Sequence, residues 1–256
     1  MILRTLPVPA PADQVLAVCA DFHSVYRNMR LDETLRLLEE AMPDLILCPG
    51  DIFNIIAPDD APESCFNQNG MDFLRRAAAL APVFYSIGNH EHAVTTEHLS
   101  EIAKTGAVVL DNSFVRCGEL VIGGYTTGFL GMKGKHTGPK EPDPDFPAVF
   151  GAQEGYKILL SHHPEYWEKT IRGHGIDLTV SGHAHGGQWR FFGHGVFAPG
   201  QGLFPKYTSG LYSYDAGSKT EFLAVSRGMR NTQRLIPRFF NPCEILILRL
   251  SPEARL

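Results

Sequence analysis

The sequence predicts a layered α/β fold. Short apolar runs recur through the first two-thirds of the chain, most of them end in a turn of polar residues, and amphipathic helical patterns lie between several of them. Runs of four to six apolar residues bounded by turn residues are typical of buried strands. Because strand and helix patterns alternate along the chain, we expect helices packed on a sheet.

Five runs have the strand form, in chain order: VLAVCA (15–20), LILC (45–48), PVFYSI (82–87), KILLS (157–161) and DLTVS (177–181). The first helical pattern places one apolar residue on the same face at every turn, at Leu31, Leu35, Leu38 and Met42. A helix with one buried side requires this spacing. Three further stretches are predicted as helices: residues 70–81, 96–105 and 164–173.

The chain changes character after residue 190. Short β-like runs alternate there with turns, and no convincing helical pattern is present. We therefore expect a second, mainly antiparallel sheet packed on the first and closed by a strand at 244–250. The Pro-rich stretch 138–147 is predicted as a surface loop. Since the sequence contains no repeat, low-complexity tract or linker, we expect residues 1–256 to form a single domain.

The composition is ordinary for a globular protein, with 44% hydrophobic and 20% charged residues. A net charge of −5 argues against a nucleic-acid-binding surface, which needs clustered Lys and Arg. The five cysteines are scattered and odd in number, as expected in a reducing compartment. The N-terminal stretch MILRTLPVPAPADQ predicts neither a signal peptide nor a membrane anchor, and no transmembrane segment is evident. We therefore expect a cytoplasmic protein, for which peripheral membrane contact stays open.

Polar side chains that suit a metal follow the five predicted strands. The strand ends carry D-x-H (Asp21, His23), G-D (Asp51), G-N-H-E (Asn89, His90, Glu91), a histidine pair (His162, His163) and G-H-x-H (His183, His185). Reacting groups in open α/β sheets collect at the carboxyl ends of strands. Carboxylates, imidazoles and one amide suit Mn²⁺, Fe or Zn²⁺ better than Ca²⁺. These groups outnumber the ligands that one ion needs, so a central aspartate is expected to bridge two ions about 3.5–4 Å apart. A site with two such ions predicts phosphoester hydrolysis.

This ordered series of motifs, from Asp21 to His185, resembles the calcineurin-like metallophosphoesterase superfamily. The form SGHAHGGQ (181–188) and the later VSRG (225–228) are similar to a bacterial branch. That branch contains membrane-associated phosphodiesterases and UDP-2,3-diacylglucosamine pyrophosphatase-like enzymes. The resemblance implies a four-layer α/β/β/α sandwich of two mixed β-sheets flanked by helices.

The resemblance also implies two metal sites that share one aspartate. The first ion would take Asp21, His23, Asp51 and His185, and the second would take Asp51, Asn89, His162 and His183. A hydroxide that bridges the two ions would be the nucleophile. His90 would protonate the leaving oxygen or steady the phosphate, and Glu91 would orient it. An imidazole suits that acid, because the pKa of a free histidine side chain lies near neutral.

Some assignments are less direct. Between the adjacent histidines, the family pattern places the ligand first after the strand, which favours His162 and makes His163 a neighbour that packs or contacts substrate. Arg27 and Arg227 are expected to contact the substrate phosphate, since guanidinium groups suit phosphate oxygens. The small residues of SGHAHGGQ are expected to leave room for metals, water and substrate. Gln188 receives no role.

The function implied is that of a dinuclear metal-dependent phosphohydrolase, a phosphodiesterase or pyrophosphatase. Its substrate would be a small phosphoester or a nucleotide or lipid diphosphate. Mn²⁺ is the expected metal, and Fe, Zn or Ni stay open. Two alternatives remain: a phosphomonoesterase or protein phosphatase on the same site, and a non-catalytic metal-binding interaction scaffold. Apolar residues either line a groove for acyl chains or belong to the core, among them Phe53, Ile55, Ile56, Phe129, Leu130, Phe191 and Phe192.

Overall fold

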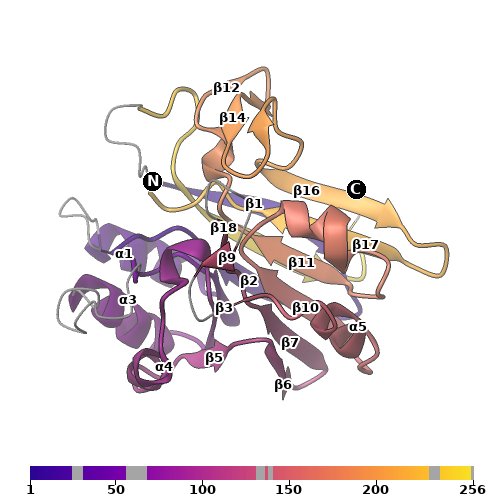
Figure 1. Ribbon diagram of the computed structural model, residues 1–256, viewed down its shortest axis with the longest axis horizontal. Helices are drawn as coiled ribbons and strands as arrows, with labels where there is room; N and C mark the ends of the chain where they lie inside the picture. Colours follow the sequence, from indigo (N-terminus) through magenta and orange to yellow (C-terminus); the bar gives the residue numbers. More distant parts are fainter. Residues whose placement is uncertain (25–30, 56–67, 131–135, 138–140, 231–236, 255–256) are drawn as a thin grey trace.

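Two six-stranded sheets face each other in the computed structural model, and helices lie on their outer sides (Figure 1). The structure describes residues 1–24, 31–55, 68–130, 136–137, 141–230 and 237–254. The predicted sandwich of two mixed sheets flanked by helices is confirmed.

The first sheet contains the strands that lead to the aspartate motifs. Its order is β1 (Ile2–Pro9), β18 (Glu244–Ser251), β2 (Gln14–Val18), β3 (Leu45–Pro49), β4 (Val83–Ser86) and β5 (Val108–Leu110). β2 to β5 are parallel, β18 runs antiparallel to β2, and β1 pairs with β18 in parallel. Strands from the two ends of the chain therefore pair within one sheet.

The second sheet contains the strands that lead to the histidine motifs. Its order is β16 (Gly210–Asp215), β17 (Thr220–Val225), β11 (Leu178–Ser181), β10 (Tyr156–Ser161), β7 (Leu120–Tyr125) and β6 (Ser113–Cys117). The four central strands are parallel, and the two edge strands are antiparallel to them.

One prediction about this sheet is wrong. Of the strands after residue 190, β16 and β17 join β10 and β11, whereas β18 joins the first sheet. The late residues therefore do not form a mainly antiparallel sheet of their own. A local pattern identifies a strand, but its pairing partners are decided by which faces bury together.

Three helices confirm predicted ones with small shifts at their ends: α1 (Leu31–Ala41), α3 (Gln68–Ala78) and α4 (Thr96–Ala103). The helix predicted at 164–173 is shorter, a π-helical turn η2 at Trp167–Ile171. α5 (Phe146–Gly151) begins inside the stretch predicted as a loop. Pro147 lies in its first turn, where the missing N–H costs no hydrogen bond.

Apolar side chains fill three interfaces between the four layers. Ala17 of β2 and Cys19 just after it pack with the core beneath α1, α3 and α4, whereas Leu16 and Val18 of β2 pack against the second sheet. A third cluster joins the other side of the second sheet to α5 and η2. This follows from the alternation of side chains along a strand. Phe53 belongs to the core, as does Ile55, while Ile56 lies outside the described residues.

Residues 190–203 form two short hairpins outside the large sheets. β12 (Arg190–Phe191) pairs with β13 (His194–Gly195), and β14 (Phe197–Ala198) pairs with β15 (Gly202–Leu203). They project at the top of Figure 1. A further short pair is β8 (Phe129–Leu130) with β9 (His136–Thr137). Among the described helices, none has the length and apolar character needed to cross a bilayer.

Candidate metal centre

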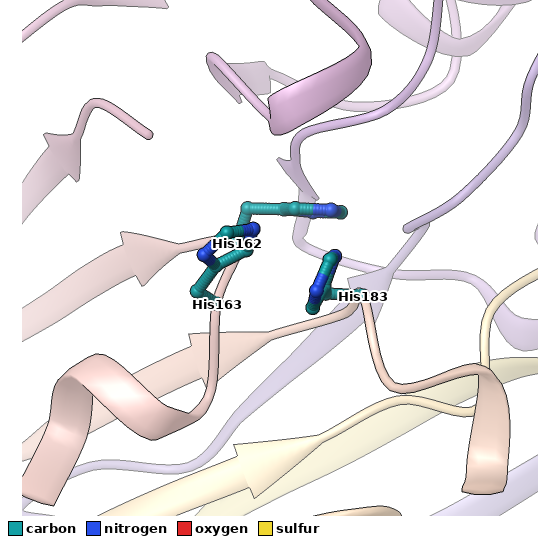
Figure 2. Close-up of side chains that lie close together, drawn as sticks. All are labelled: His162, His163 and His183. Atoms are coloured by element: carbon teal, nitrogen blue, oxygen red, sulfur yellow. The ribbon is translucent and has the colours of Figure 1, made fainter. Parts of the chain in front are cut away.

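Loops that follow strands of both sheets bring the predicted ligands into one buried site. The described residues form four groups whose ligand atoms lie within 4.8 Å of one another: Asp21, His23 and His185; His23, Asp51 and His90; Asp21, Asp51 and His162; His162, His163 and His183. Figure 2 shows the last group, in which the three rings lie together at the ends of β10 and β11. Asn89 joins it, since its Oδ1 lies 3.2 Å from His163 Nε2.

The backbone of this site is unusual. Five predicted ligands have a left-handed conformation: Asp21 (φ 55°), His23 (φ 46°), Asp51 (φ 56°), His183 (φ 65°) and His185 (φ 45°). This conformation costs an L-residue about 1–2 kcal/mol. Such strain persists where surrounding contacts enforce it, and it is concentrated at functional sites.

The spacing of the donor atoms fits bound cations. His23 Nε2 is buried without a hydrogen bond and lies 4.0 Å from Asp21 Oδ1 and 3.7 Å from Asp51 Oδ2. His185 Nε2 lies 3.6 Å from the same Asp21 oxygen. These separations are too long for hydrogen bonds. Two ligands of one ion, each about 2.1 Å from it, are separated by roughly 3–4 Å, depending on the coordination angle.

His162 lies between the two carboxylates. In the tautomer protonated at Nδ1, the ring donates to Pro49 O at 2.8 Å. Its Nε2 then lies 3.1 Å from Asp51 Oδ2 and 3.9 Å from Asp21 Oδ1. A histidine whose second nitrogen is fixed by a carbonyl is typical of metal ligands. His163 also reaches the site, but these contacts favour His162 as the ligand, which stays a prediction.

Burial and nearby charges set the protonation of the imidazoles. Burial lowers the pKa of His23 to about 4 and lowers the pKa values of His183 and His185 well below their usual range. Burial also disfavours charge on His162, but Asp51 outweighs it and raises the pKa of His162 to about 9. Metal ligands must be deprotonated. Three imidazoles are therefore neutral near pH 7, whereas His162 must release a proton to bind a metal.

The G-N-H-E motif forms a tight turn at Asn89–Glu91. The Glu91 carboxylate is buried and accepts hydrogen bonds from the backbone N–H groups of Gly88 (2.7 Å), Asp51 (3.0 Å) and Phe53 (2.8 Å). Glu91 thus links the loop that carries Asp51 to the loop that carries Glu91 itself. Its expected action on the His90 ring stays a prediction.

His90 is positioned by the same pair of loops. Its backbone N–H donates to Asp51 Oδ1 at 2.8 Å, and its ring meets the His23 ring edge to face at 4.7 Å between centroids. Unlike the buried His23, the His90 residue is half-buried. It therefore borders the site on a side that solvent reaches.

The two glycines that follow the second histidine of SGHAHGGQ are packed closely against other parts of the protein, so neither position has room for a side chain. A Cβ on Gly186 would lie 2.1 Å from Asn241 Oδ1, and one on Gly187 would lie 2.4 Å from the Cα of Gly195. Asn241 Nδ2 also donates to the carbonyl oxygen of His185 at 2.7 Å. At these two positions protein atoms already leave no room for a side chain, and the expected need for room for metal and substrate stays a prediction. The atoms that exclude a side chain belong to the protein.

The structure describes one of the two arginines predicted to bind substrate. Arg27 lies outside the described residues. Arg227 Nε donates to Ser209 Oγ at 2.9 Å and lies 3.4 Å from Glu244 Oε2, so its contacts are with the protein.

Arg238 reaches the site instead, and sequence reasoning missed it. Its Nη2 lies 3.1 Å from His185 Nδ1, and its buried Nε and Nη1 have no hydrogen-bond partner. The only signal in the sequence was an arginine in the stretch that precedes the closing strand. That signal is weak, because arginines in loops are usually solvated.

Comparison with known proteins agrees with this geometry. Residues 15–187 match the family described as calcineurin-like phosphoesterase. A metallophosphoesterase of Aquifex aeolicus is 27% identical, over 97% of this chain and 89% of that protein. Phosphodiesterase YaeI of Escherichia coli is 31% identical, over 62% of this chain and 55% of that protein. A metallophosphoesterase of Helicobacter pylori is also 31% identical, but this chain spans only 43% of its length.

A solved crystal structure shares the fold, with a TM-score of 0.50 at 11% identity. The superposition covers 83% of this chain and 90% of that one. At this identity the likeness supports the arrangement of sheets and helices alone.

Proposed function

Because this chain belongs to the calcineurin-like phosphoesterase family, we propose that it is a two-metal hydrolase that prefers phosphodiesters or pyrophosphates. Family membership makes it a metal-dependent phosphoric ester hydrolase, while the number of ions and the substrate class are proposals. The observation that supports two ions is the position of Asp51, which shares one group of ligand atoms with His23 and another with His162, the ligands proposed for different ions.

The proposed ligands divide between two ions around Asp51. Asp21, His23, Asp51 and His185 hold the first, and Asp51, Asn89, His162 and His183 hold the second. Two divalent cations supply Lewis acidity toward a phosphoryl oxygen and lower the pKa of water. We propose Mn²⁺, with Fe, Zn and Ni as metals that the same donors accept.

His90 is proposed as the residue that donates a proton or a hydrogen bond to the substrate. Its ring borders the site where solvent has access, so a substrate can meet it without displacing a buried imidazole. A ring N–H in that position donates to the leaving oxygen or to a phosphoryl oxygen. Glu91 acts at a distance from the substrate, because its hydrogen bonds hold the backbone of the two loops.

Arg238 is proposed to bind the substrate phosphate. Burying a guanidinium with two unpaired nitrogens is unfavourable unless an anion completes its hydrogen bonds. A phosphate accepts two of these bonds at once. We therefore expect Arg238→Lys to raise KM with little change in kcat, whereas Arg227→Lys, the matched control, leaves KM unchanged. Equal effects of the two changes would contradict the assignment.

The preference for diesters is supported by the name of one relative, phosphodiesterase YaeI. A cytoplasmic location is supported by the described cysteines, which are all free. The proposal that residues 1–256 form one domain is supported by two observations. β1 pairs with β18, and the two sheets share a core.

The substrate class is tested with two chromogenic esters. Hydrolysis of bis-p-nitrophenyl phosphate and of p-nitrophenyl phosphate is compared with Mn²⁺ added, and we expect a higher kcat/KM for the diester. A preference for the monoester would show a phosphomonoesterase or protein phosphatase. Metal analysis of the loaded protein should give two ions per chain, and one ion would contradict the dinuclear site.

The catalytic residues are tested by substitution. Asp51→Asn and His90→Ala should each abolish hydrolysis in a protein that keeps its circular dichroism spectrum. Asp13→Asn and His174→Ala, both at exposed positions, are the matched controls and should keep full activity. Unchanged turnover in Asp51→Asn would favour a scaffold with adventitious activity.

A further inference from the structure

The side chain of Asn54 contacts a proposed metal ligand, although the proposed function gives it no role. Asn54 follows Asp51 by three residues in the loop after β3, and its Oδ1 lies 3.0 Å from His23 Nδ1. The backbones of the two loops also pair, since the His23 N–H donates to Asp51 O at 2.9 Å. Asn54 therefore reaches the His23 ring from a neighbouring loop whose position is fixed.

The two ring nitrogens of His23 have different surroundings. Nε2 faces the carboxylates of Asp21 and Asp51, at 4.0 and 3.7 Å, whereas Nδ1 faces Asn54. A neutral imidazole carries one proton, and only the nitrogen without that proton can bind a metal. The position of the proton therefore decides whether Nε2 of His23 can act as a ligand.

The contacts of the His23 ring favour a proton on Nδ1. In that tautomer the Nδ1–H donates to Asn54 Oδ1 over a normal hydrogen-bond length. In the other tautomer the Nε2–H would have no acceptor among the described residues, because both carboxylates lie beyond hydrogen-bond distance. A buried N–H without an acceptor is unfavourable. The Asn54 oxygen thus selects the tautomer in which Nε2 can bind a metal.

The backbone of the Asn54 loop is held without the Asn54 side chain. The N–H of Phe53 donates to Glu91 Oε1 at 2.8 Å, and the N–H of Ile55 donates to His90 O at 2.6 Å. Both neighbours of Asn54 are therefore fixed through the main chain. An asparagine that merely closed a turn would bond to the backbone of its own loop, whereas this side chain bonds to the ring of a proposed ligand.

A similar contact orients His162, a proposed ligand of the second ion. Its Nδ1–H donates to Pro49 O at 2.8 Å, so a backbone carbonyl is the partner there. Partners of this kind fix the ring orientation and raise the basicity of a metal-binding histidine. For His23 the partner is a side chain, so its contact can be removed by substitution while that of His162 serves as an internal reference.

We propose that Asn54 is a positioning residue, which holds His23 in the tautomer protonated at Nδ1 and thereby presents Nε2 to the first ion. The ion rests on the proposed function, whereas the hydrogen bond and the tautomer do not. Loss of such a partner weakens metal binding about 10- to 100-fold in other sites. Asn54→Asp keeps an acceptor oxygen and should keep the effect, while Asn54→Leu is similar in size and removes it.

Nuclear magnetic resonance of the full chain tests the hydrogen bond directly. At saturating Zn²⁺, which is diamagnetic, we expect an imidazole Nδ1–H signal from His23 that exchanges slowly with water, and a second from His162. The His23 signal is assigned by its absence in His23→Gln. Asn54→Leu should remove the His23 signal and keep that of His162, whereas Asn54→Asp should keep both. Because the protein sets the tautomer, the same pattern is expected without metal.

Metal affinity tests the consequence. In competition with a chelating dye, Asn54→Leu should bind one of the two ions about tenfold more weakly or worse, and Asn54→Asp should bind both as tightly as the unchanged protein. Gln201→Leu is the matched control, because the Gln201 amide accepts from Tyr207 N–H at 2.9 Å and donates to Tyr207 O at 2.7 Å. Losing these backbone contacts should lower the free energy of unfolding and leave both metal affinities unchanged.

Each of four results would overturn the proposal: a His23 ring protonated at Nε2 in the unchanged protein, a slowly exchanging His23 Nδ1–H that survives in Asn54→Leu, unchanged metal affinity in Asn54→Leu, or an Asn54→Asp protein that binds metal as weakly as Asn54→Leu. If Asn54→Leu does not fold, the first measurement still decides, because it uses the unchanged protein. One ion per chain, or no hydrolysis, would contradict the proposed function and leave the tautomer measurement intact.

Discussion

Replacing Gly187 by alanine should separate the metal-site loop from the first small hairpin. Gly187 has φ of +78°, and an added Cβ would lie 2.4 Å from the Cα of Gly195 and 3.0 Å from its carbonyl carbon. The left-handed conformation costs an L-residue about 1–2 kcal/mol. Overpacking adds about 1–3 kcal/mol, because the opposing atoms are backbone and do not rotate away. The predicted loss in the free energy of unfolding is therefore about 2–5 kcal/mol.

Gly193→Ala is the matched control for this change. Gly193 has φ of +85° in the turn of the same hairpin, but no heavy atom lies within 4 Å of the added Cβ. It should lose only the conformational part, about 1–2 kcal/mol. Urea unfolding of the metal-free proteins gives the difference. Metal affinity should also fall in Gly187→Ala, since His185 lies two residues earlier, and stay unchanged in Gly193→Ala. Equal losses of stability in the two variants would refute the steric argument.

Three further predictions concern the loops of the metal site. Metal affinity should rise with pH by up to about tenfold per unit between pH 7 and 9 and then level off, because the pKa of His162 is raised to about 9 and its proton must leave. Competition with a chelating dye measures the affinity, and an affinity that does not change with pH would contradict the prediction. His162→Ala should lower the metal content from two ions to one, whereas His163→Ala should keep both, as elemental analysis would show; the reverse order would make His163 the ligand. In the present protein the Asn241 amide donates hydrogen bonds to the carbonyl oxygens of His185 and Gln188, and Asn241→Asp replaces this donor with an oxygen. Urea titration should show a free energy of unfolding lower by about 1–3 kcal/mol. An unchanged free energy of unfolding would mean that Asn241 does not hold this loop.

Much of the fold followed from local patterns. The five apolar runs are strands, and the three longest helical patterns are helices. The errors concern pairing and short elements, such as α5 and the sheets to which β16, β17 and β18 belong. A six-residue helix has too few turns for a periodic signal. Periodicity does not show to which sheet a strand belongs, because a buried parallel strand is a continuous apolar run in either sheet.

By itself, the sequence determined which side chains gather at the site and what chemistry they carry. Asp21, Asp51 and His183 each follow an apolar strand, and the ends of such strands meet. Their identity as donors is a property of the residues alone, which is why the implied reaction class needed no coordinates.

Only the tertiary structure decided what surrounds those side chains. The approach of Arg238 to His185, the contact of Gly187 with Gly195 and the exposure of Phe192 each depend on how distant segments pack. Asn241 closes the His185 loop across 56 positions of the chain. Contacts at that range leave no periodic trace in a sequence, because they are set by the faces that the sheets and hairpins bury against one another.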